Sequence, residues 1–558
     1  MNRHRFLGFG RLVLAVILPA LIVLSMDAPA SVAQDATPIT QPDNLTGVTP
    51  LSLTGERRAQ FEAYVADALL RYGVPGASIA VVQGGDVVYL NGFGVTKAGS
   101  TQPVTPDTMM MIGSVTKSMT TMLAATLVDD GRLTWDTRLV DVLPDFAVGD
   151  PELTESLTVR DAFCNCAGIP GRDLELFFES NAFTPQGVVT ALANVAPTAA
   201  LGERFQYNNL LIGAAGYAVG VAAGGGMNDV ALAYDVAMRE RVLGPIGMVR
   251  STFDPQEALA GGNFAIPHAT DLSGTLQPVP LVADRSVLSV APSGALWSNA
   301  REMARYVQTE LAQGVAPDGT RVVSAENLQQ TWAPGVALPS SPALPSVLTE
   351  SQMNYGLGWS LGAYHGQRLI SHSGGTYGFA SEVAFLPEAD LGIVILTNAR
   401  TPFAAFNYAV QFRLLELLFD QPFEIDEQMS SLLDAYEAAS AMEFGTTDSS
   451  AVAPYLGRYT NPDLGEVAIS LRGERLMLDA GELISELRPL PVDGAEPTTY
   501  LMHDPPLSLL SEAKVGTVHF EMASGGQPQM DLVIGANPTG PGRVYVFESL
   551  TEGGTPTP

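Results

Sequence analysis

The chain has 558 residues, of which 46% are hydrophobic and only 16% charged, a composition typical of folded proteins and too apolar for a disordered one. Its length exceeds what one hydrophobic core usually supports, so we expect two globular units joined by linkers. The formal net charge of −30 argues against a nucleic-acid partner, because binding to a phosphate backbone needs clustered Lys and Arg.

The N-terminus has the pattern of a secretory signal peptide. Basic residues precede the apolar run 12–24, and small residues lead to a cleavage site after Ala33. We predict a signal peptide over 1–33, a polar linker over 34–52, and a secreted or periplasmic protein. A retained N-terminal anchor is the alternative, and membrane attachment is expected only in that case.

Helix and strand patterns follow in turn. Apolar residues at helical spacing predict a helix over 57–70, which Gly73 closes. Two apolar runs, 77–82 and 87–93, flank a Gly-rich turn and predict a β-hairpin. Helical patterns and loops with Gly or Pro then dominate from about 114 to 310.

Strand patterns return in the second half of the chain. We predict strands over 368–372, 380–385 and 392–397 and a helix over 404–418. This order predicts an α+β fold over 53–425, in which an antiparallel sheet is flanked by helices and the long insertion forms a helical lobe. A cleft between the two lobes is the expected place for an active site.

The last part of the chain changes character. Residues 426–450 are rich in Asp, Glu, Ser and Ala and are predicted to be a linker. From 451 to 552 short β-type runs alternate with Gly and Pro turns, which predicts a small all-β barrel or sandwich.

Cys164 and Cys166 are the two cysteines of the chain. A zinc site needs about four ligands, and no His or further Cys lies near in sequence, so we expect a structural thiol pair or a local disulfide. The six histidines form no metal-binding spacing, and we expect neither a metal nor a cofactor.

The first catalytic motif is S-x-x-K, formed by Ser114 and Lys117 at the start of a helical pattern over 119–128. Three residues apart on a helix, the two side chains share one face, so the amine can help the hydroxyl lose its proton. The chain has only three lysines, Lys97, Lys117 and Lys514, so a lysine at this spacing is unlikely to be incidental. Arg could not replace it, because a guanidinium stays protonated.

Two further motifs follow along the chain. Tyr207 and Asn209 form Y-x-N before an apolar helical run, where a surface turn would be the ordinary interpretation. A phenol beside a lysine becomes a usable base when the cation favours phenolate. His372, Ser373, Gly374 and Gly375 follow an apolar strand, and its glycines leave a backbone N–H free as an oxyanion donor.

S-x-x-K, Y-x-N and H-x-G in this order resemble the serine β-lactamase and penicillin-binding-protein family of class C type, over about 53–420. Segments that also resemble the family are LTVRD (157–161), AGIP (167–170), LGPIGM (243–248), SGALWS (293–298) and YGLGW (355–359).

The resemblance implies a catalytic role for each motif. Ser114 would be acylated, Tyr207 as phenolate or through Lys117 would take its proton, and Asn209 would orient substrate and lysine. The resemblance also implies that His372 binds substrate and tunes Tyr207, and that the N–H groups of Ser114 and Gly375 form the oxyanion hole. The C-terminal domain resembles the lipocalin-like barrels appended to some of these hydrolases.

Two departures from the family pattern bear on the substrate. Efficient β-lactamases of this family have K-T-G where this chain has His372-Ser373-Gly374, so a titratable group replaces a fixed positive charge. H-x-G is similar to members that act as esterases or D-amino-acid peptidases, and we expect an acidic limb of activity from His372. Cys164-Asn165-Cys166 stands where relatives commonly have His-Thr-Ser.

The sequence thus predicts an exported serine hydrolase with a small-molecule or peptide substrate: an ester, a D-amino-acid peptide or a β-lactam. An α/β-hydrolase is disfavoured because no G-x-S-x-G elbow occurs. A penicillin-binding or wall-binding receptor that does not hydrolyse its ligand remains the alternative. The oligomeric state is left open.

Overall fold

The computed structural model describes residues 44–178, 183–341, 344–349, 351–441, 444–490, 499–511, 516–535 and 542–550. The predicted signal peptide and residues 34–43 of the predicted linker lie outside the described residues. Within the described ranges, no helix is both long and apolar enough to cross a membrane.

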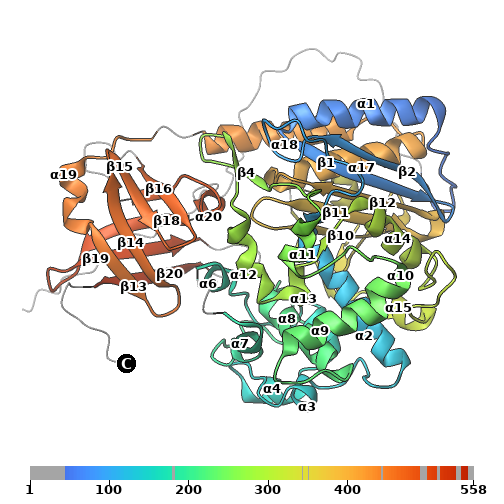
Figure 1. Cartoon of the computed structure of the whole chain (residues 1–558), viewed down its shortest axis with the longest axis horizontal. Helices are drawn as coiled ribbons and strands as arrows, with labels where there is room; N and C mark the ends of the chain where they lie inside the picture. Colours follow the sequence, from blue (N-terminus) through green and yellow to red (C-terminus); the bar gives the residue numbers. More distant parts are fainter. Residues whose placement is uncertain are drawn as a thin grey trace, which may run out of the picture. The chain divides into compact units, whose positions relative to one another are not determined.

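One antiparallel sheet, in the order β2-β1-β12-β11-β10-β9-β8-β7, forms the centre of the larger part (Figure 1). The predicted hairpin and the three predicted strands are confirmed, whereas β7, β8 and β9 are too short to have produced a pattern. The strands are β1 (Gly76–Gln83), β2 (Asp86–Gly94), β7 (Val336–Ala337), β8 (Asn354–Tyr355), β9 (Ser360–Tyr364), β10 (Gln367–Gly375), β11 (Ala380–Leu386) and β12 (Leu391–Thr397).

Apolar clusters cover both faces of this sheet. Along β1, Ile79 and Val81 belong to one cluster, and Ala80 and Val82 belong to the other. Because successive side chains of a strand point to opposite faces, a strand covered on both sides is apolar throughout. The first cluster includes residues of α1 (Gly55–Arg71) and α17 (Ala405–Leu418), and the second includes residues of α2 (Thr116–Asp129) and α14 (Ala300–Leu311).

The insertion after β2 forms the helical lobe (Figure 1). Helix α8 (Asn209–Ala222) of this lobe is buried over most of its length and packs against α2. The helices of this region are α3 (Leu139–Val142), α4 (Pro151–Ser156), α5 (Val159–Phe163), α6 (Asp173–Phe178), α7 (Pro185–Thr190), α8 (Asn209–Ala222), α9 (Val230–Met238), α10 (Gly244–Ile246), α11 (Pro255–Ala260), α12 (Arg285–Leu288), α13 (Ala291–Gly294) and α15 (Ala325–Thr331). The short α16 (Ser346–Thr349) lies between β7 and β8 and packs into the cluster of α1 and α17. Two short strand pairs complete the lobe: β3 (Met110–Met111) with β6 (Trp297–Ser298), and β4 (His268–Thr270) with β5 (Leu276–Pro278).

The two predicted linkers differ from the structure. Most of 426–450 is helical, as α18 (Ile425–Ser440), whose Ile425 and Met429 pack into the cluster beneath α1 and α17. Most residues of this helix are polar, so the few apolar positions that anchor it formed no recognisable helical pattern in the sequence. The described end of the N-terminal linker is also packed, since Leu45 is buried and its N–H donates to the His365 carbonyl at 2.8 Å.

The C-terminal residues form a closed antiparallel barrel, in agreement with the predicted all-β unit. The α+β fold with a small β domain is therefore confirmed. The elements are α19 (Ser449–Val452), β13 (Gly457–Asn461), β14 (Gly465–Arg472), β15 (Arg475–Asp479), β16 (Ile484–Pro489), β17 (Thr499–Met502), α20 (Ser508–Ser511), β18 (Gly516–Met522), β19 (Pro528–Ile534) and β20 (Arg543–Ser549).

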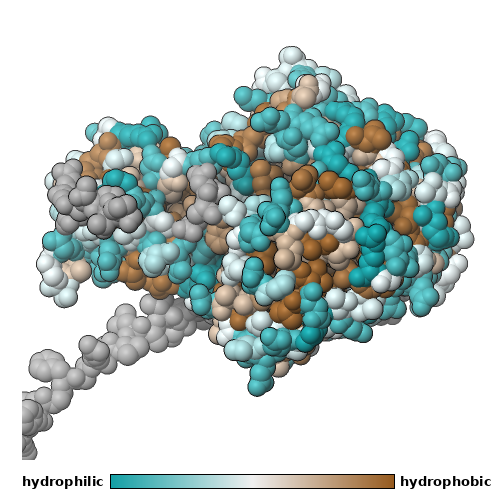
Figure 2. Space-filling model, turned by 60° about the horizontal axis from the view of Figure 1, so that its bottom comes forward, coloured by the Kyte–Doolittle hydropathy of each residue, from teal (hydrophilic) through white to brown (hydrophobic). Residues whose placement is uncertain are grey.

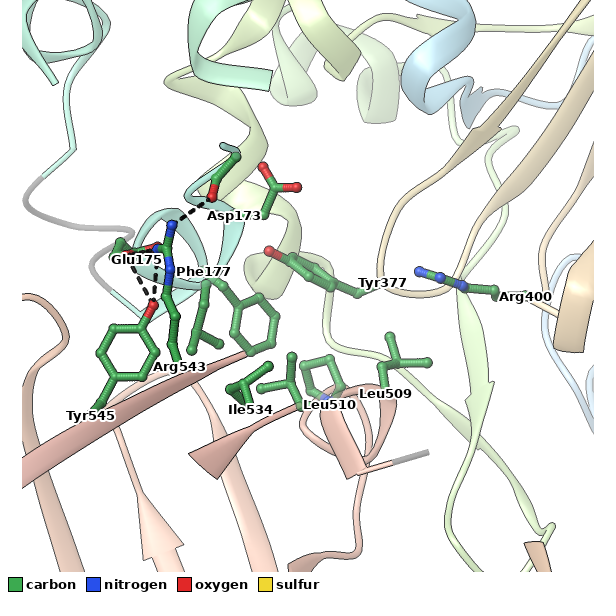
Figure 3. Close-up of a pocket in the computed structure, with 13 residues that line it drawn as sticks. Asp173, Glu175, Phe177, Tyr377, Arg400, Leu509, Leu510, Ile534, Arg543 and Tyr545 are labelled. Carbon is green, nitrogen blue, oxygen red and sulfur yellow. Dashed lines mark hydrogen bonds and ion pairs between the residues drawn. The ribbon is translucent and has the colours of Figure 1, made fainter. Parts of the chain in front are cut away.

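The barrel contacts the helical lobe through α6. Glu175 accepts hydrogen bonds from Arg543 at 2.8 Å and from the Tyr545 hydroxyl at 3.0 Å (Figure 3). It also pairs with Arg172 at 2.8 Å. Phe177 joins the apolar cluster of the barrel interior. The Glu175 side chain of the lobe is thus held by Arg543 and Tyr545 of β20, the last strand of the barrel.

Apolar side chains also reach the surface. Figure 2 shows them in separate patches among hydrophilic residues, on the barrel and on the larger part alike. The most exposed, Leu70 and Val249, lie at the end of α1 and just after α10. Scattered exposure of this kind is normal for folded proteins and indicates no binding face.

Candidate active site

Ser114 lies in the 3-10 turn Gly113–Val115 that leads into α2. Gly113 has a φ of +52°, and a Cβ at this position would lie 2.5 Å from the amide nitrogen of Gly375. Only glycine allows this left-handed turn so close to a strand. The chain therefore brings the serine directly beside the end of β10.

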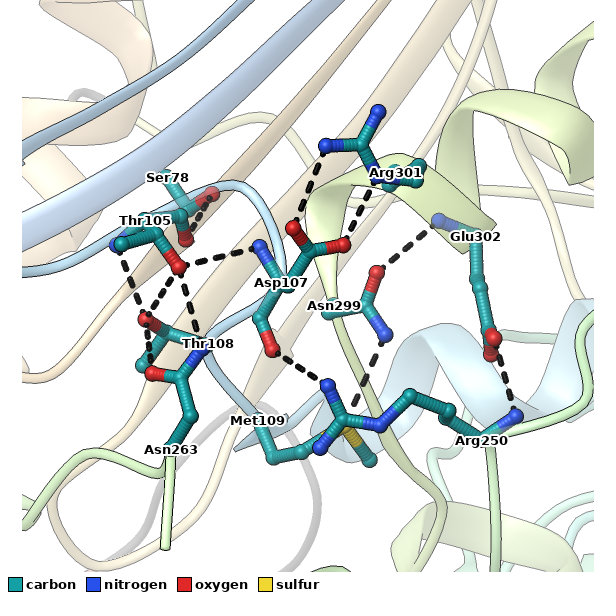
Figure 4. A network of polar contacts seen from close by, with 10 residues as sticks. All are labelled: Ser78, Thr105, Asp107, Thr108, Met109, Arg250, Asn263, Asn299, Arg301 and Glu302. Carbon is teal, nitrogen blue, oxygen red and sulfur yellow. Dashed lines mark hydrogen bonds and ion pairs between the residues drawn. The ribbon is translucent and has the colours of Figure 1, made fainter. Parts of the chain in front are cut away.

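A polar network holds the segment that precedes Ser114 (Figure 4). The Asp107 carboxylate pairs with both ends of the Arg301 guanidinium at 2.7 and 3.1 Å, and the Asp107 carbonyl accepts from Arg250 at 3.1 Å. The Thr108 hydroxyl donates to Asn263 at 2.8 Å. These contacts hold the loop before β3, from which the catalytic turn starts.

Lys117 is fully buried and aimed at the serine. Its Nζ lies 2.9 Å from Ser114 Oγ, 2.7 Å from Asn209 Oδ1 and 2.7 Å from the Ser293 carbonyl. All three are neutral oxygens, and burial, which outweighs the opposite effect of the Asp173 charge, lowers the pKa of Lys117 to about 7. The amine is therefore available as a base near neutral pH.

Tyr207 completes the cluster around the serine. Its hydroxyl lies 2.7 Å from Ser114 Oγ, and Lys117 Nζ lies 4.6 Å from the centre of its ring. Burial raises the pKa of Tyr207, so the phenol stays protonated. The structure brings together Ser114, Lys117 and Tyr207, and it favours Lys117 over a Tyr207 phenolate as the base.

The segment containing Tyr207 is held by the loop of the two cysteines, which form a disulfide. Between them Asn165 has a φ of +52°, and its carbonyl and side-chain oxygens accept from the N–H groups of Gln206 and Asn208 at 2.7 and 3.0 Å. Asn tolerates the left-handed region better than most residues. The Cys-Asn-Cys sequence thus acquires a structural role on both sides of Tyr207.

Asn209, which the resemblance implied would orient substrate and lysine, lies between Lys117 and the carboxylate of Asp173. Its Oδ1 accepts from Lys117, and its Nδ2 donates to Asp173 Oδ1 at 3.0 Å. Sequence reasoning missed Asp173 and the role of the Ser293 backbone. No local pattern marks Asp173, whereas Ser293 stands in one of the segments that resemble the family.

His372 differs from the expectation. It is 5% exposed, and its Nε2 lies 2.9 Å from the Tyr355 hydroxyl while its Nδ1 lies 2.6 Å from the Ser373 carbonyl. Burial, with a smaller effect of the charge on Lys117, lowers the pKa of His372 to about 3. An imidazole with so low a pKa argues against His372 as the source of the predicted acidic limb, which stays a prediction, and its hydrogen-bond partner is the Tyr355 hydroxyl.

The remaining residues of the third motif form the edge beside the serine. Ser373 and Gly375 are exposed, whereas a Cβ on Gly374 would collide with the Ile112 carbonyl. The Ser381 hydroxyl donates to the same carbonyl at 2.7 Å. The glycines thus allow β10 to approach the catalytic turn, which lies next to the Gly375 amide.

The described residues contain no group of three or more His, Cys, Asp or Glu side chains arranged to hold a metal ion. Cys164 and Cys166 are joined to each other, which decides between the two interpretations left open by their spacing.

Comparisons with known proteins agree with this arrangement. A family model described as Beta-lactamase matches residues 58–417. Penicillin-binding protein 4 of Amycolatopsis lactamdurans is 32% identical over 335 residues, 60% of this chain and 83% of that protein. An unguisins hydrolase of Aspergillus campestris is 27% identical over 446 residues, 75% of this chain and 79% of that protein.

Two solved structures share the fold. The octameric penicillin-binding protein homologue from Pyrococcus abyssi aligns with a TM-score of 0.55 at 21% identity, over 88% of this chain and 100% of the other. The D-alanine carboxypeptidase AmpC from Burkholderia cenocepacia aligns with a TM-score of 0.50 at 21% identity, over 64% of this chain and 98% of the other. Because the family model matches most of the sequence, and the sheet, the lobe and the three motifs agree with it, this chain belongs to the Beta-lactamase family.

Proposed function

We propose that this protein is a serine hydrolase that forms an acyl-enzyme on Ser114 and cleaves an amide or ester bond. The observation that supports this best is the convergence of Lys117 Nζ and the Tyr207 hydroxyl on Ser114 Oγ, at 2.9 and 2.7 Å. Relatives named as a hydrolase and as a penicillin-binding protein are in keeping with it.

In the first step the neutral amine of Lys117 accepts the proton of Ser114 while Oγ bonds to the acyl carbon. The bond to the leaving amine or alcohol then breaks, and Tyr207 passes a proton to the leaving group and regains one from Lys117. Water attacks the ester carbon of the acyl-enzyme by the same route in reverse, which releases the acid and restores Ser114.

Two backbone N–H groups would stabilise the negative charge that develops on the acyl oxygen. One is the N–H of Ser114, in the turn that precedes α2. The other is the N–H of Gly375, which lies next to this turn at Gly113. Fixed donors of this kind stabilise an oxyanion without reorganisation, and losing one typically costs a factor of about 10²–10³ in rate.

Peptides and esters are better candidates than β-lactams. The group in the place of the family's positively charged lysine is a buried His372, whose pKa of about 3 keeps it neutral. A β-lactam carboxylate would therefore meet no fixed positive charge from this residue.

The test compares steady-state hydrolysis of a chromogenic ester by the native protein, by Ser114→Ala and by the exposed-serine control Ser52→Ala. We expect sustained turnover that falls at least about 10³-fold in Ser114→Ala and is unchanged in the control. One burst of product per enzyme without turnover would favour the alternative, a receptor that is acylated and not regenerated.

We also propose that the protein is exported. The predicted signal peptide supports this, as does the disulfide, because disulfides persist mainly in oxidising compartments. Recovery of a mature chain beginning at Gln34 outside the cytoplasm would bear the proposal out, and an intact N-terminus in the cytoplasm would contradict it.

A further inference from the structure

The three contacts of Lys117 decide whether its amine can act as a base. Its Nζ lies 2.9 Å from Ser114 Oγ, 2.7 Å from Asn209 Oδ1 and 2.7 Å from the Ser293 carbonyl. A neutral amine offers two hydrogens and one lone pair. The Ser293 carbonyl and Asn209 Oδ1 can only accept hydrogen bonds, so they take the two hydrogens and leave the lone pair for Ser114.

This arrangement depends on which way the side-chain amide of Asn209 is turned. With its oxygen and nitrogen exchanged, Nδ2 would face Lys117 and donate to the lone pair, and the amine could no longer accept the proton of Ser114. A neutral amine does not select between the two orientations, because it can donate or accept. The Asn209 carbonyl accepts from the Ser293 hydroxyl at 2.6 Å, which fixes the backbone at this position but not the amide.

Asp173 selects the productive orientation. Its Oδ1 accepts from Asn209 Nδ2 at 3.0 Å. An ionised carboxylate has no hydrogen to donate, so it bonds to Nδ2 and would repel Oδ1. The exchanged orientation would therefore lose one hydrogen bond and bring two oxygens together.

Asp173 is the first residue of α6, a helix that is anchored to the barrel by the Glu175–Arg543 ion pair. Its own side chain is exposed and forms no ion pair with another described residue. Replacing this carboxylate therefore leaves no cavity in the core and removes none of the ion pairs that hold α6.

We propose, on the basis of the proposed function, that Asp173 is a positioning residue for the reaction: it keeps the Asn209 amide turned so that the lone pair of Lys117 is reserved for the catalytic serine. Asp173 acts through Asn209 and transfers no proton itself. It lies outside the three sequence motifs, and the barrel helps to place it because α6 carries both Asp173 and Glu175.

The charge of Asp173 has a second effect on Lys117, which can be measured separately. It raises the pKa of Lys117, although burial lowers that pKa by more. The other titratable groups around the two residues are uncharged near neutral pH or paired with each other: His372, Tyr207, Tyr377 and the pair Glu175–Arg543. The guanidinium of Arg400 lines the cavity beside α6 on the far side of the Tyr377 ring (Figure 3). Because Lys117 acts only when neutral, loss of the Asp173 charge should move the acidic limb of kcat/KM to lower pH by about half a unit.

The test is a double-mutant cycle of Asp173→Asn and Asn209→Ala, measured as kcat/KM for a chromogenic ester at about pH 8.5, where Lys117 is neutral. Asparagine has nearly the size of aspartate but can donate as well as accept, so it no longer selects one orientation. We expect Asp173→Asn to lower kcat/KM by about fivefold in the native protein, the factor of one ordinary hydrogen bond, and by less than about 1.5-fold in Asn209→Ala. An equal loss in both backgrounds, or no loss in the native protein, would overturn the proposal.

Two further variants separate orientation of the amide from a general disturbance of α6. Asp173→Glu keeps an acceptor that has no hydrogen and should retain at least about half of the native rate. Asp463→Ala removes the exposed partner of Arg172, the residue before Asp173, and should leave kcat/KM within about 1.5-fold of the native value. A larger loss in Asp463→Ala than in Asp173→Asn would make the effect structural and contradict the proposal. An unmoved acidic limb in Asp173→Asn would mean that Asp173 carries no charge to lose, which also contradicts it.

Variants that are too slow for turnover assays are compared by the rate at which a fluorophosphonate labels Ser114, followed by mass spectrometry. In this reaction the serine oxygen bonds to phosphorus and fluoride leaves, and the proton goes to the same lone pair of Lys117, so the same pattern is expected. Labelling and hydrolysis that persist in Ser114→Ala would refute the proposed function, whereas additive losses in the cycle would refute only the role of Asp173.

Discussion

Lys117 and Glu175 are both charged residues buried in the same protein, yet their surroundings lead to opposite consequences. Lys117 is surrounded by neutral oxygens, and its pKa falls to about 7. Glu175, 3% exposed, is bound by the guanidinium groups of Arg172 and Arg543. Burial of Lys117 outweighs the opposite effect of the Asp173 charge and leaves a base that can titrate near neutral pH, whereas burial between opposite charges produces a clamp that joins two parts of the chain.

Replacing Lys117, the reactive one of the two groups, has the largest expected effect on kcat/KM. Lys117→Arg should lower kcat/KM by about 10³–10⁴-fold, because a guanidinium cannot accept a proton. The isosteric neutral variant Lys117→Met should lose a similar amount. The matched control Lys97→Arg, at an exposed position, should retain full activity. Circular dichroism checks folding, and an active, folded Lys117→Arg protein would refute the role as a base.

Replacing Glu175 breaks the clamp. Glu175→Gln removes the carboxylate of Arg543 and one of the two carboxylates of Arg172, which also pairs with Asp463 at 3.2 Å. It should lower the free energy of unfolding by about 3 kcal/mol, measured by urea denaturation. Glu482→Gln is the control, because Glu482 pairs with the more exposed Arg285 and should cost less than about 1 kcal/mol. Equal losses of unfolding free energy in the two variants would show that burial does not increase the contribution of the Glu175 ion pairs to stability.

The pH profile sharpens the contrast by testing which buried group titrates. Lys117 acts as a base only when neutral, so kcat/KM should rise about tenfold per pH unit below pH 7 and level off above roughly pH 8. His372, with a pKa of about 3, stays neutral throughout this range. The midpoint should therefore persist in His372→Gln. A midpoint displaced by a full unit or more in that variant would assign the limb to the imidazole.

Reducing the disulfide between Cys164 and Cys166 should have the smallest effect on kcat/KM. Without the disulfide, Asn165 is less firmly held against Gln206 and Asn208, and Tyr207 loses some of its alignment. We expect dithiothreitol to lower kcat/KM by roughly tenfold or less, since misplaced catalytic groups slow the reaction. The double variant Cys164→Ser/Cys166→Ser should show the lower rate and no response to the reductant. Full activity in the reduced protein would limit the disulfide to a passive role.

Much of the fold followed from periodicity. The hairpin β1–β2, the strands β10 to β12 and the helices α1 and α17 match their predicted positions within a few residues, because each has a long run of apolar side chains at one spacing. The short strands β7 to β9 had too few residues to show a period. Helix α18 was taken for a linker, because its composition is polar and its anchoring residues are few.

The catalytic cluster was predictable because its motifs combine reactive residues with glycines and helix starts. Ser114 and Lys117 are close in sequence, so local helix geometry brings them together. The cavity lined by α6 and the barrel was not predictable, since Asp173 and Leu510 lie more than 300 residues apart and no sequence pattern relates them.

The sequence by itself determined the class of fold and identified Ser114 and Lys117 as the candidate nucleophile and base, because those depend on local spacing and apolar periodicity. Only the tertiary structure decided how deeply Lys117 and His372 are buried, which lowers the pKa of both, and which residues line the cavity beside α6. Desolvation depends on every neighbour that excludes water, and those neighbours come from distant parts of the chain. For the same reason His372 is a buried group hydrogen-bonded to Tyr355, and residues of the barrel line a cavity together with α6.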